Sequence, residues 1–173
     1  MTPGLALRPL TAADEREAWR AHDELAPEGF DFLLDGRRDD WDGYLAHLAA
    51  EQAGVDLPPG RVPATFLVAD VGGVLVGRVS VRHELNEALA RVGGHIGYAV
   101  RPAYRRRGYA TEMLRRSLAV ARSVGVERAL VTCDDDNVAS ARTIERCGGV
   151  LQDLVPVDDG PPKRRYRVGT SDS

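Results

Sequence analysis

One stretch of the chain, residues 98–110, reads YAVRPAYRRRGYA. It predicts a strand that ends near Val100, a short basic loop after Pro102, and a helix that begins at Gly108, because proline cannot continue a strand ladder. The first N–H groups of a helix lack acceptors within the helix, and the aligned peptide dipoles place partial positive charge there. Gly108 lets the backbone approach a ligand closely, and Ala110 keeps the helix start uncrowded. The stretch therefore predicts a turn that binds an anion such as a diphosphate, with arginines at its rim.

The chain after this turn alternates helix and strand. Small and apolar residues recur at spacings of three and four from Ala110 onward, which predicts one buried helical stripe. Short apolar runs separated by Gly, Pro and Asp predict strands. The elements expected here are a helix at 108–123 ended by Gly125, a strand at 128–133, a helix capped by Asp136 or Asn137 and reaching Arg146 before Gly148-Gly149, strands at 150–155 and 163–168, and a frayed tail at 169–173.

The chain before the turn contains two helices and a hairpin. Thr11 is a plausible cap for the first helix, and the Gly72-Gly73 pair joins two β-rich runs. The elements expected here are a strand at 5–8, helices at 12–25 and 41–53, strands at 64–69 and 74–82, a loop through 86–90, and a strand at 93–100. Strands and helices that alternate in this way favour a mixed α/β architecture.

Composition limits the class of protein. The 173 residues suit one domain, and 43% hydrophobic with 28% charged residues can build a core. The longest apolar stretches are far shorter than the ~20 residues that span a bilayer, and no basic region leads into an apolar run at the start. Cys133 and Cys147 have no metal-ligand spacing. We therefore expect a cytoplasmic protein with no membrane segment and no metal site.

Charge is distributed unevenly along the chain. Residues 1–60 hold five Arg against thirteen acidic residues, whereas residues 101–128 hold eight Arg against two Glu. An acidic first third could attract a cationic substrate, and the arginine cluster could hold a ligand that carries phosphate. Two solvated faces would give the same pattern. Nucleic-acid binding is not expected, because the chain is acidic overall and carries no recognition module.

The sequence resembles the GNAT superfamily of N-acetyltransferases. Their cofactor loop reads Arg or Gln, two residues, Gly, one residue, then Gly or Ala, and Arg105, Gly108 and Ala110 match it. Residues 137–149, NVASARTIERCGG, are similar to the later helix of that family. The resemblance implies a mixed, mostly antiparallel sheet with a splayed parallel strand pair at 93–100 and 128–133, and helices on both faces.

The resemblance also implies how one domain would be divided and where acetyl-CoA would bind. Residues 1–61 would shape the acceptor side, and residues 62–168 would form the cofactor-binding core. Backbone N–H groups near Ala99 and Val100 would bond the pantetheine arm and stabilise an oxyanion. The other cofactor contacts implied are Arg105, Arg106, Arg107, Gly108, Tyr109, Ala110, Thr111, Asn137 and Ser140. Asn137 could equally cap its own helix, and Ser140 could act only locally.

Two positions depart from the family pattern. Ile144 stands where many members have a tyrosine that protonates the leaving thiolate, and Ile96 stands where many have a carboxylate or His. The candidates for a replacement base are His83, Glu84, Glu87 and His95. Glu84 ranks first because it follows a strand end that can face the acceptor, although an exposed hairpin carboxylate would look the same. His95 is expected more often as a structural residue than as a base, and Tyr98 as a core aromatic.

The function expected is direct transfer of an acetyl group from acetyl-CoA to a primary amine of a small molecule or peptide. Cys133 could suggest a covalent route, but a thiol at the end of a core strand is expected to be structural. The alternative is a module that binds or senses acyl-CoA without turnover, because both usual catalytic positions hold isoleucine. Similar proteins often dimerise through the last strands, and the sequence leaves a homodimer open.

Overall fold

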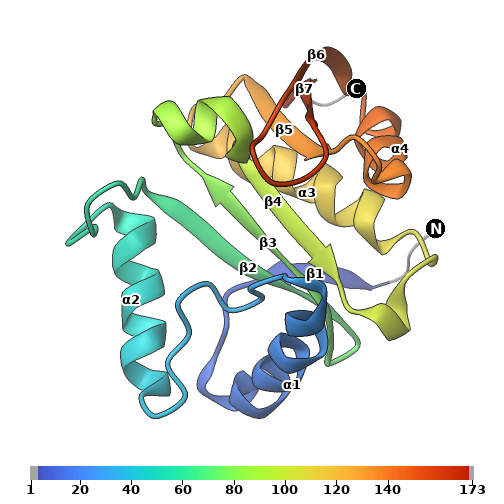
Figure 1. Ribbon diagram of the computed structural model, residues 1–173. Coiled ribbons are helices and arrows are strands. Elements are labelled where there is room, and N and C mark those ends of the chain that lie inside the picture. Colours follow the sequence, from blue (N-terminus) through green and yellow to red (C-terminus); the bar gives the residue numbers. More distant parts are fainter. Residues whose placement is uncertain (1–3, 172–173) are drawn as a thin grey trace.

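The computed structural model describes residues 4–171 and contains seven strands and four α-helices of eight or more residues within that range (Figure 1). Most boundaries match those expected from the sequence, including both N-terminal helices and the hairpin at Gly72-Gly73. The elements are β1 (Leu5–Arg8), α1 (Glu15–Leu25), α2 (Trp41–Ala53), β2 (Ala64–Val71), β3 (Val74–Arg82), β4 (Ile96–Val100), α3 (Tyr109–Ser123), β5 (Arg128–Asp134), α4 (Val138–Arg146), β6 (Val150–Val155) and β7 (Lys163–Gly169).

The strands form two antiparallel sheets, ordered β1-β2-β3-β4 and β5-β7-β6. His95 links the two sheets just before β4, because its N–H donates to the carbonyl of Leu130 at 2.7 Å and its ring Nδ1 accepts the Leu130 N–H at 2.8 Å. Within residues 4–171 no backbone ladder joins β4 to β5. The mixed α/β architecture is confirmed. In place of the one sheet that the family resemblance implies, the strands form two sheets. The parallel pairing of β4 with β5 stays a prediction.

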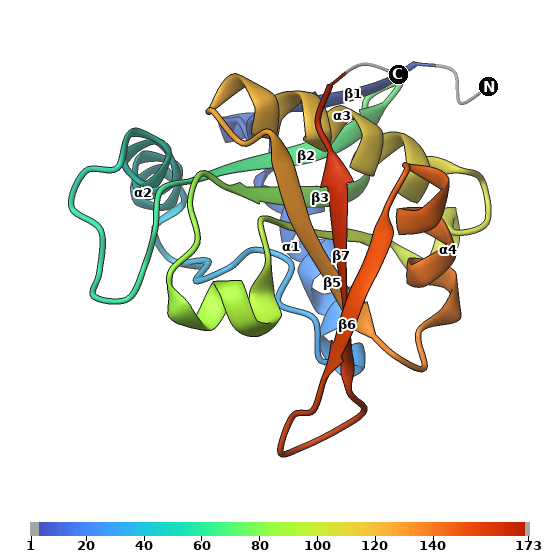
Figure 2. The ribbon, with the colours of Figure 1, turned by 90° about the horizontal axis from the view of Figure 1, so that it is seen from above.

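Helices cover both faces of the first sheet. Figure 2 shows α3 on one side of β1–β4 and α1 on the other. Alternation along β2 explains this sandwich, because successive side chains point to opposite faces. Phe66 and Val68 pack in the cluster of α1 and α2, whereas Leu67 and Ala69 pack with Met113 of α3. Each face of β2 is thus apolar and buried.

Two boundaries differ from the sequence predictions. The strand predicted at 93–100 begins only at Ile96, because Leu89–Gly93 forms a helical turn in place of the predicted loop and strand start. Gly94 then has φ of +70°, and a Cβ there would lie 2.5 Å from the carbonyl oxygen of Leu130, so only glycine fits. This close approach is what allows His95 to reach β5.

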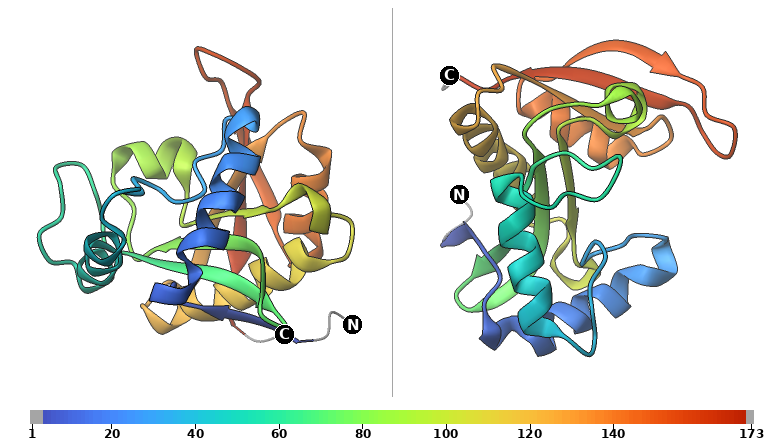
Figure 3. Two further views of the ribbon diagram at one scale, coloured as in Figure 1. Left: turned by 90° about the horizontal axis from the view of Figure 1, so that it is seen from below. Right: turned by 90° about the vertical axis from the view of Figure 1, so that its left-hand side faces the viewer.

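The predicted frayed tail also differs from the structure at its start. Gly169 belongs to β7, and Thr170 is 5% exposed and donates its hydroxyl to the Val126 carbonyl at 2.7 Å. Residues 172 and 173 lie outside the described residues. The β6–β7 hairpin projects away from the rest of the chain (Figure 3), and β6 is an edge strand whose apolar Val150, Leu151 and Leu154 are exposed. The possible homodimer stays a prediction.

Asp14 ties β1 to the start of α1. Its carboxylate accepts two hydrogen bonds from Arg8, at 2.7 and 2.9 Å, and one from the Thr11 N–H at 2.7 Å. The Arg8 hydrogen bond, opposed by burial, lowers the pKa of Asp14. A carboxyl with a lowered pKa in the folded state stabilises the protein above its unfolded pKa and loses that stabilisation as pH falls through the folded value.

We predict that Asp14→Asn lowers the free energy of unfolding by about 2 kcal/mol at pH 7, the scale of a charge-assisted hydrogen bond. The difference from wild type should narrow as pH falls below about 4, the pKa of an unfolded aspartate, and on through the lower pKa of Asp14 in the folded protein. Urea unfolding at pH 7 and at pH 3 measures both values. Asp136→Asn at an exposed position is the control. A difference that is the same at both pH values would contradict the assignment.

Candidate active site

The turn between β4 and α3 has the geometry of an anion site. Gly108 is the N-cap of α3 with φ of +81°, and no side chain within residues 4–171 caps the helix. The first N–H groups of α3 therefore have neither an intrahelical acceptor nor a side-chain acceptor. Arg106, with φ of +62°, and Arg107 are both exposed beside this helix start. The Arg107 guanidinium donates to the Ala103 carbonyl at 3.3 Å.

The arginine predicted to begin the cofactor motif is already paired. Arg105 donates to both carboxylate oxygens of Glu28, at 3.0 and 2.7 Å, and its Nε donates to the Val100 carbonyl at 3.0 Å. The Arg105 hydrogen bond lowers the pKa of Glu28. The buried Arg101 pairs in the same way with Glu24, at 2.9 and 2.8 Å. Two acidic residues of the first third, Glu24 and Glu28, thus neutralise arginines of the loop, and attraction of a cationic substrate by the rest of that segment stays a prediction.

The edge of β4 that faces β5 is joined to no strand within residues 4–171, although its Val100 carbonyl accepts from Arg105. Two hydrogen bonds fix the phase of the β3–β4 ladder: Arg101 N–H to the Val76 carbonyl at 2.8 Å and Arg82 N–H to the His95 carbonyl at 2.7 Å. Alternation in an antiparallel pair then turns the N–H of Ala99 toward β3 and the N–H of Val100 toward β5. Of the two backbone donors predicted, Val100 faces β5, and Ala99 is used within the sheet.

The start of α4 reaches β4 through one hydrogen bond. The hydroxyl oxygens of Tyr98 and Ser140 lie 2.9 Å apart. Asn137 caps α4, because its side-chain oxygen accepts the Ser140 N–H at 3.1 Å. The capping role predicted for Asn137 is therefore confirmed. Burial raises the pKa of Tyr98 to about 12, although the Ser140 hydrogen bond lowers it, so the Tyr98 hydroxyl keeps its proton at neutral pH.

The two predicted catalytic residues lie apart from this turn. His95 is 7% exposed, and its Nδ1 accepts the Leu130 N–H. Burial first, and the charges of Arg167 and Arg82 after it, lower the pKa of His95, so it is neutral and structural. Glu84 is exposed beyond the end of β3, at the opposite end of the sheet from residues 105–108. The structure does not bring Glu84 together with the predicted cofactor contacts.

The two isoleucines at the usual catalytic positions are core residues. Ile96 is 2% exposed and Ile144 is fully buried, and both pack in the cluster formed by α3, β5 and α4. Ile96 therefore faces α3, and its neighbour Gly97 faces the side of α1 and α2. Two arginines of β3 lie on that same face and were not predicted from the sequence: Arg78 is buried, and Arg82 is half-buried. The sequence carried a signal for them, because Arg78 and Arg82 are four residues apart and so lie on the same face of a strand that is otherwise mostly apolar.

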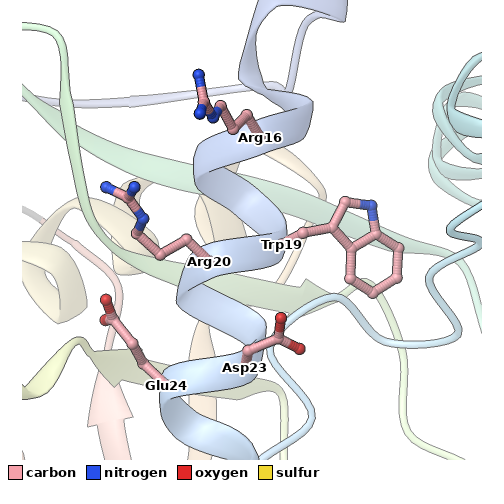
Figure 4. Close-up of a pocket in the computed structure, with 5 residues that line it drawn as sticks. All are labelled: Arg16, Trp19, Arg20, Asp23 and Glu24. Carbon is pink, nitrogen blue, oxygen red and sulfur yellow. The ribbon is translucent and has the colours of Figure 1, made fainter.

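Two hollows lie on or beside α1. One, of about 500 Å³, is lined by Arg16, Trp19, Arg20, Asp23 and Glu24 (Figure 4). Figure 4 shows Arg20 and Glu24 on one side of the helix and Trp19 and Asp23 on the other. Asp23 is paired with Arg38 and Glu24 with Arg101, so neither carboxylate is free to act as a base. The other hollow, of about 400 Å³, lies in the segment between α1 and α2 and includes Phe30 and Asp31.

The turn, the free edge of β4 and the start of α4 lie within the part of the chain that matches a known family. Residues 5–150 match the family model described as an acetyltransferase (GNAT) domain. The chain belongs to the GNAT acetyltransferase family. The resemblance seen in the sequence is confirmed, and the protein is an acyltransferase by family. No protein among the curated sequences matches it.

Solved structures agree with GNAT membership at the level of the fold. RimJ of Mycobacterium smegmatis, in complex with CoA-disulfide, has a TM-score of 0.72 at 20% identity, covering 97% of this chain and 83% of that one. The self-immunity acetyltransferase MccE, in complex with acetyl-CoA and AMP, has a TM-score of 0.70 at 16% identity, covering 96% and 93%. A chimera of spermidine N-acetyltransferase SpeG from Vibrio cholerae and hSSAT has a TM-score of 0.66 at 16% identity, covering 96% and 95%.

Two further findings concern the GNAT chain as described. No helix within residues 4–171 is both long and apolar enough to cross a bilayer. The same residues contain no cluster of three or more His, Cys, Asp or Glu side chains placed to hold a metal ion. Cys133 is buried and Cys147 is half-buried, and both are free thiols. Burial raises the pKa of the Cys133 thiol, which disfavours the nucleophilic thiolate.

We predict that His95 can be replaced without loss of activity if its hydrogen bond is kept. His95→Leu leaves the buried Leu130 N–H without an acceptor and should destabilise the protein by about 1–3 kcal/mol. His95→Asn offers a carbonyl oxygen near the position of Nδ1 and should recover much of that loss. Urea unfolding and acetyl transfer measured on both variants test this. A folded His95→Asn enzyme without activity would restore His95 as a catalytic residue.

Proposed function

We propose that this GNAT protein transfers an acetyl group from acetyl-CoA directly to a primary amine of a small molecule or peptide. The observation that carries the proposal is the uncapped start of α3 with two exposed arginines, beside a strand edge with free backbone groups. Complexes of MccE with acetyl-CoA and of RimJ with CoA-disulfide support it at the level of the fold.

The residues present fit such a cofactor. A diphosphate suits the N–H groups of residues 109–111, and Arg106 and Arg107 are placed to neutralise it. Arg105 would act differently from the family pattern, because Glu28 holds it and it fixes the loop through the Val100 carbonyl. The pantetheine arm carries amides, which can hydrogen-bond to the unpaired edge of β4 in the way that an added β-strand does. Ser140 and Asn137 are expected to border that arm.

Acetyl-CoA supplies an activated thioester, and the chain's own groups would serve its transfer. The Val100 N–H points toward β5 and can donate to a carbonyl oxygen that gains negative charge. The attacking amine forms the bond to the carbonyl carbon and loses its proton to water. As the C–S bond breaks, the Tyr98 hydroxyl, protonated at neutral pH and held by Ser140, can give a proton to the leaving thiolate in place of the tyrosine that Ile144 replaces, and it recovers a proton from water. Cys133 has no part in this route, since its thiol is buried.

The second candidate is an acyl-CoA-binding module without turnover. The full burial of Ile144 in the core favours it, because this side chain offers no proton. Release of free CoA separates the two functions. Tight acetyl-CoA binding with no CoA release across amines, peptides and aminoglycosides would establish the module and refute the enzyme.

We predict that Gly108→Asp weakens acetyl-CoA binding by at least about tenfold, since the new carboxylate repels a diphosphate at the α3 N-terminus. Gly125→Asp is the matched control, because it adds the same residue just beyond the C-terminal end of α3. Its backbone strain is similar, since φ is +92° at Gly125 and +81° at Gly108. Isothermal titration calorimetry measures both affinities. Equal affinities in the two variants, with both folded, would contradict the binding turn.

We predict that Tyr98→Phe lowers kcat by about 100-fold with little change in KM, the scale of one lost general acid. Ser140→Ala removes the hydrogen bond and keeps the tyrosine hydroxyl, so it should lower kcat much less. Steady-state release of free CoA measures both variants. A Tyr98→Phe enzyme with wild-type kcat would show that the proton reaches the thiolate by another route.

A further inference from the structure

The face of β3 toward α1 and α2 carries two arginines whose charges have no ion-pair partner within residues 4–171. Arg78 is 3% exposed, and it donates Nε to the Phe32 carbonyl at 3.0 Å and Nη2 to the Asp31 carbonyl at 2.7 Å. Arg82 donates Nη1 to the carbonyls of Gly93 and Gly94, at 3.2 and 3.1 Å. All of these acceptors are neutral backbone groups.

Other arginines of the chain are satisfied differently. The arginines that pair with carboxylates at 2.7 or 2.8 Å include Arg8, Arg101, Arg105 and Arg165. A buried charge without a counter-charge is costly. Burial, and after it the charge of Arg82, lowers the pKa of Arg78 to about 9. Burial and Arg61 lower the pKa of Arg82, and Glu51 opposes this from beyond ion-pair distance.

The two guanidinium groups converge over Gly97 of β4. The register pairs Gly97 with Ser80, which lies between the two arginines on the same face of β3. A Cβ atom at position 97 would lie 3.8 Å from Nη1 of Arg78 and 3.8 Å from both Nη atoms of Arg82, with nothing nearer. Gly97 is half-buried, and β4 is the edge strand of the first sheet, so part of this residue stays accessible to solvent.

We propose that this point binds a carboxylate of the acceptor, so that the amine acetylated is an α-amino acid or a similar small amine that carries a carboxylate. The inference rests on the proposed function and names the substrate class of the same site. Guanidinium groups suit carboxylates because their planar donors match the two oxygens. The absent side chain of Gly97 leaves room for those oxygens, and Ser80 can add a hydroxyl donor.

The location agrees with acetyl transfer. Gly97 precedes Tyr98 and lies three residues from Val100 on one strand, which is about 10 Å at ~3.3 Å per residue. A carboxylate held over Gly97 therefore leaves the amine of a small acceptor close to the free edge of β4. The Asp31 carbonyl accepts from Arg78, and the Asp31 carboxylate, one oxygen of which accepts the Leu34 N–H at 3.0 Å, is exposed on the same face of the sheet.

The test compares acceptors that differ only in the anion. CoA release is measured with an equimolar pool of α-amino acids and with the pool of their α-carboxamides. The carboxylate pool should be preferred by at least about tenfold in kcat/KM, the scale of a charge-assisted hydrogen bond. Arg82→Gln should remove the preference. Gly97→Ala, which places a methyl group at the convergence point without a positive φ, should do the same.

Controls separate this inference from the proposed function. Gly169→Ala, where a Cβ meets nothing within 4 Å, should keep the preference. The melting temperature of the protein with each pool, without acetyl-CoA, reads carboxylate binding independently of turnover. If neither pool gives CoA but the carboxylate pool alone raises the melting temperature in wild type and not in Gly97→Ala, the site stands and the enzyme proposal fails. Equal rates and equal melting temperatures with both pools, or a preference unchanged in both variants, would overturn the inference.

Discussion

The site proposed for this protein depends on how far the edge strands β4 and β5 of its two sheets are hydrogen-bonded to each other. His95 joins β4 to β5 through the backbone of Leu130, and beyond that link the two strands have no ladder among the residues described. The remaining edge of β4 therefore keeps backbone donors and acceptors that a ligand can use. The α3 N-terminus follows directly from that edge through the basic loop. One strand thus supplies both an edge for amides and, at its end, a positive turn for phosphate.

Charge has a structural use before it has a functional one. Glu24 and Glu28 of the α1 region hold Arg101 and Arg105, which fixes the loop and joins the first third of the chain to the sheet. Arginines that a ligand could use include the exposed Arg106 and Arg107 at the turn and, on the other side of the sheet, the buried Arg78 and the half-buried Arg82. An acceptor and a cofactor would then meet at β4 from opposite sides.

Local patterns in the sequence predicted most of the fold, and long-range pairing explains what they missed. The stripe of α3, the hairpin glycines and the Asn137 cap depend on neighbours in the chain, so periodicity and capping chemistry identified them. The late start of β4 depends on Gly94 meeting Leu130, which is distant in sequence. The pairing of Arg105 with Glu28, on which the role that we propose for Arg105 depends, is equally non-local. Neither the phase of the β3–β4 ladder nor the inward direction of Arg78 could be read before the register was known.

Backbone amide hydrogen exchange with and without acetyl-CoA tests the central claim most directly. The account predicts that acetyl-CoA slows exchange at Val100 and at residues 109–111, while Ala99, already bonded to β3, and Gly125 stay unchanged. Protection confined to other segments, with the amides of Val100 and the α3 start exchanging as before, would contradict it.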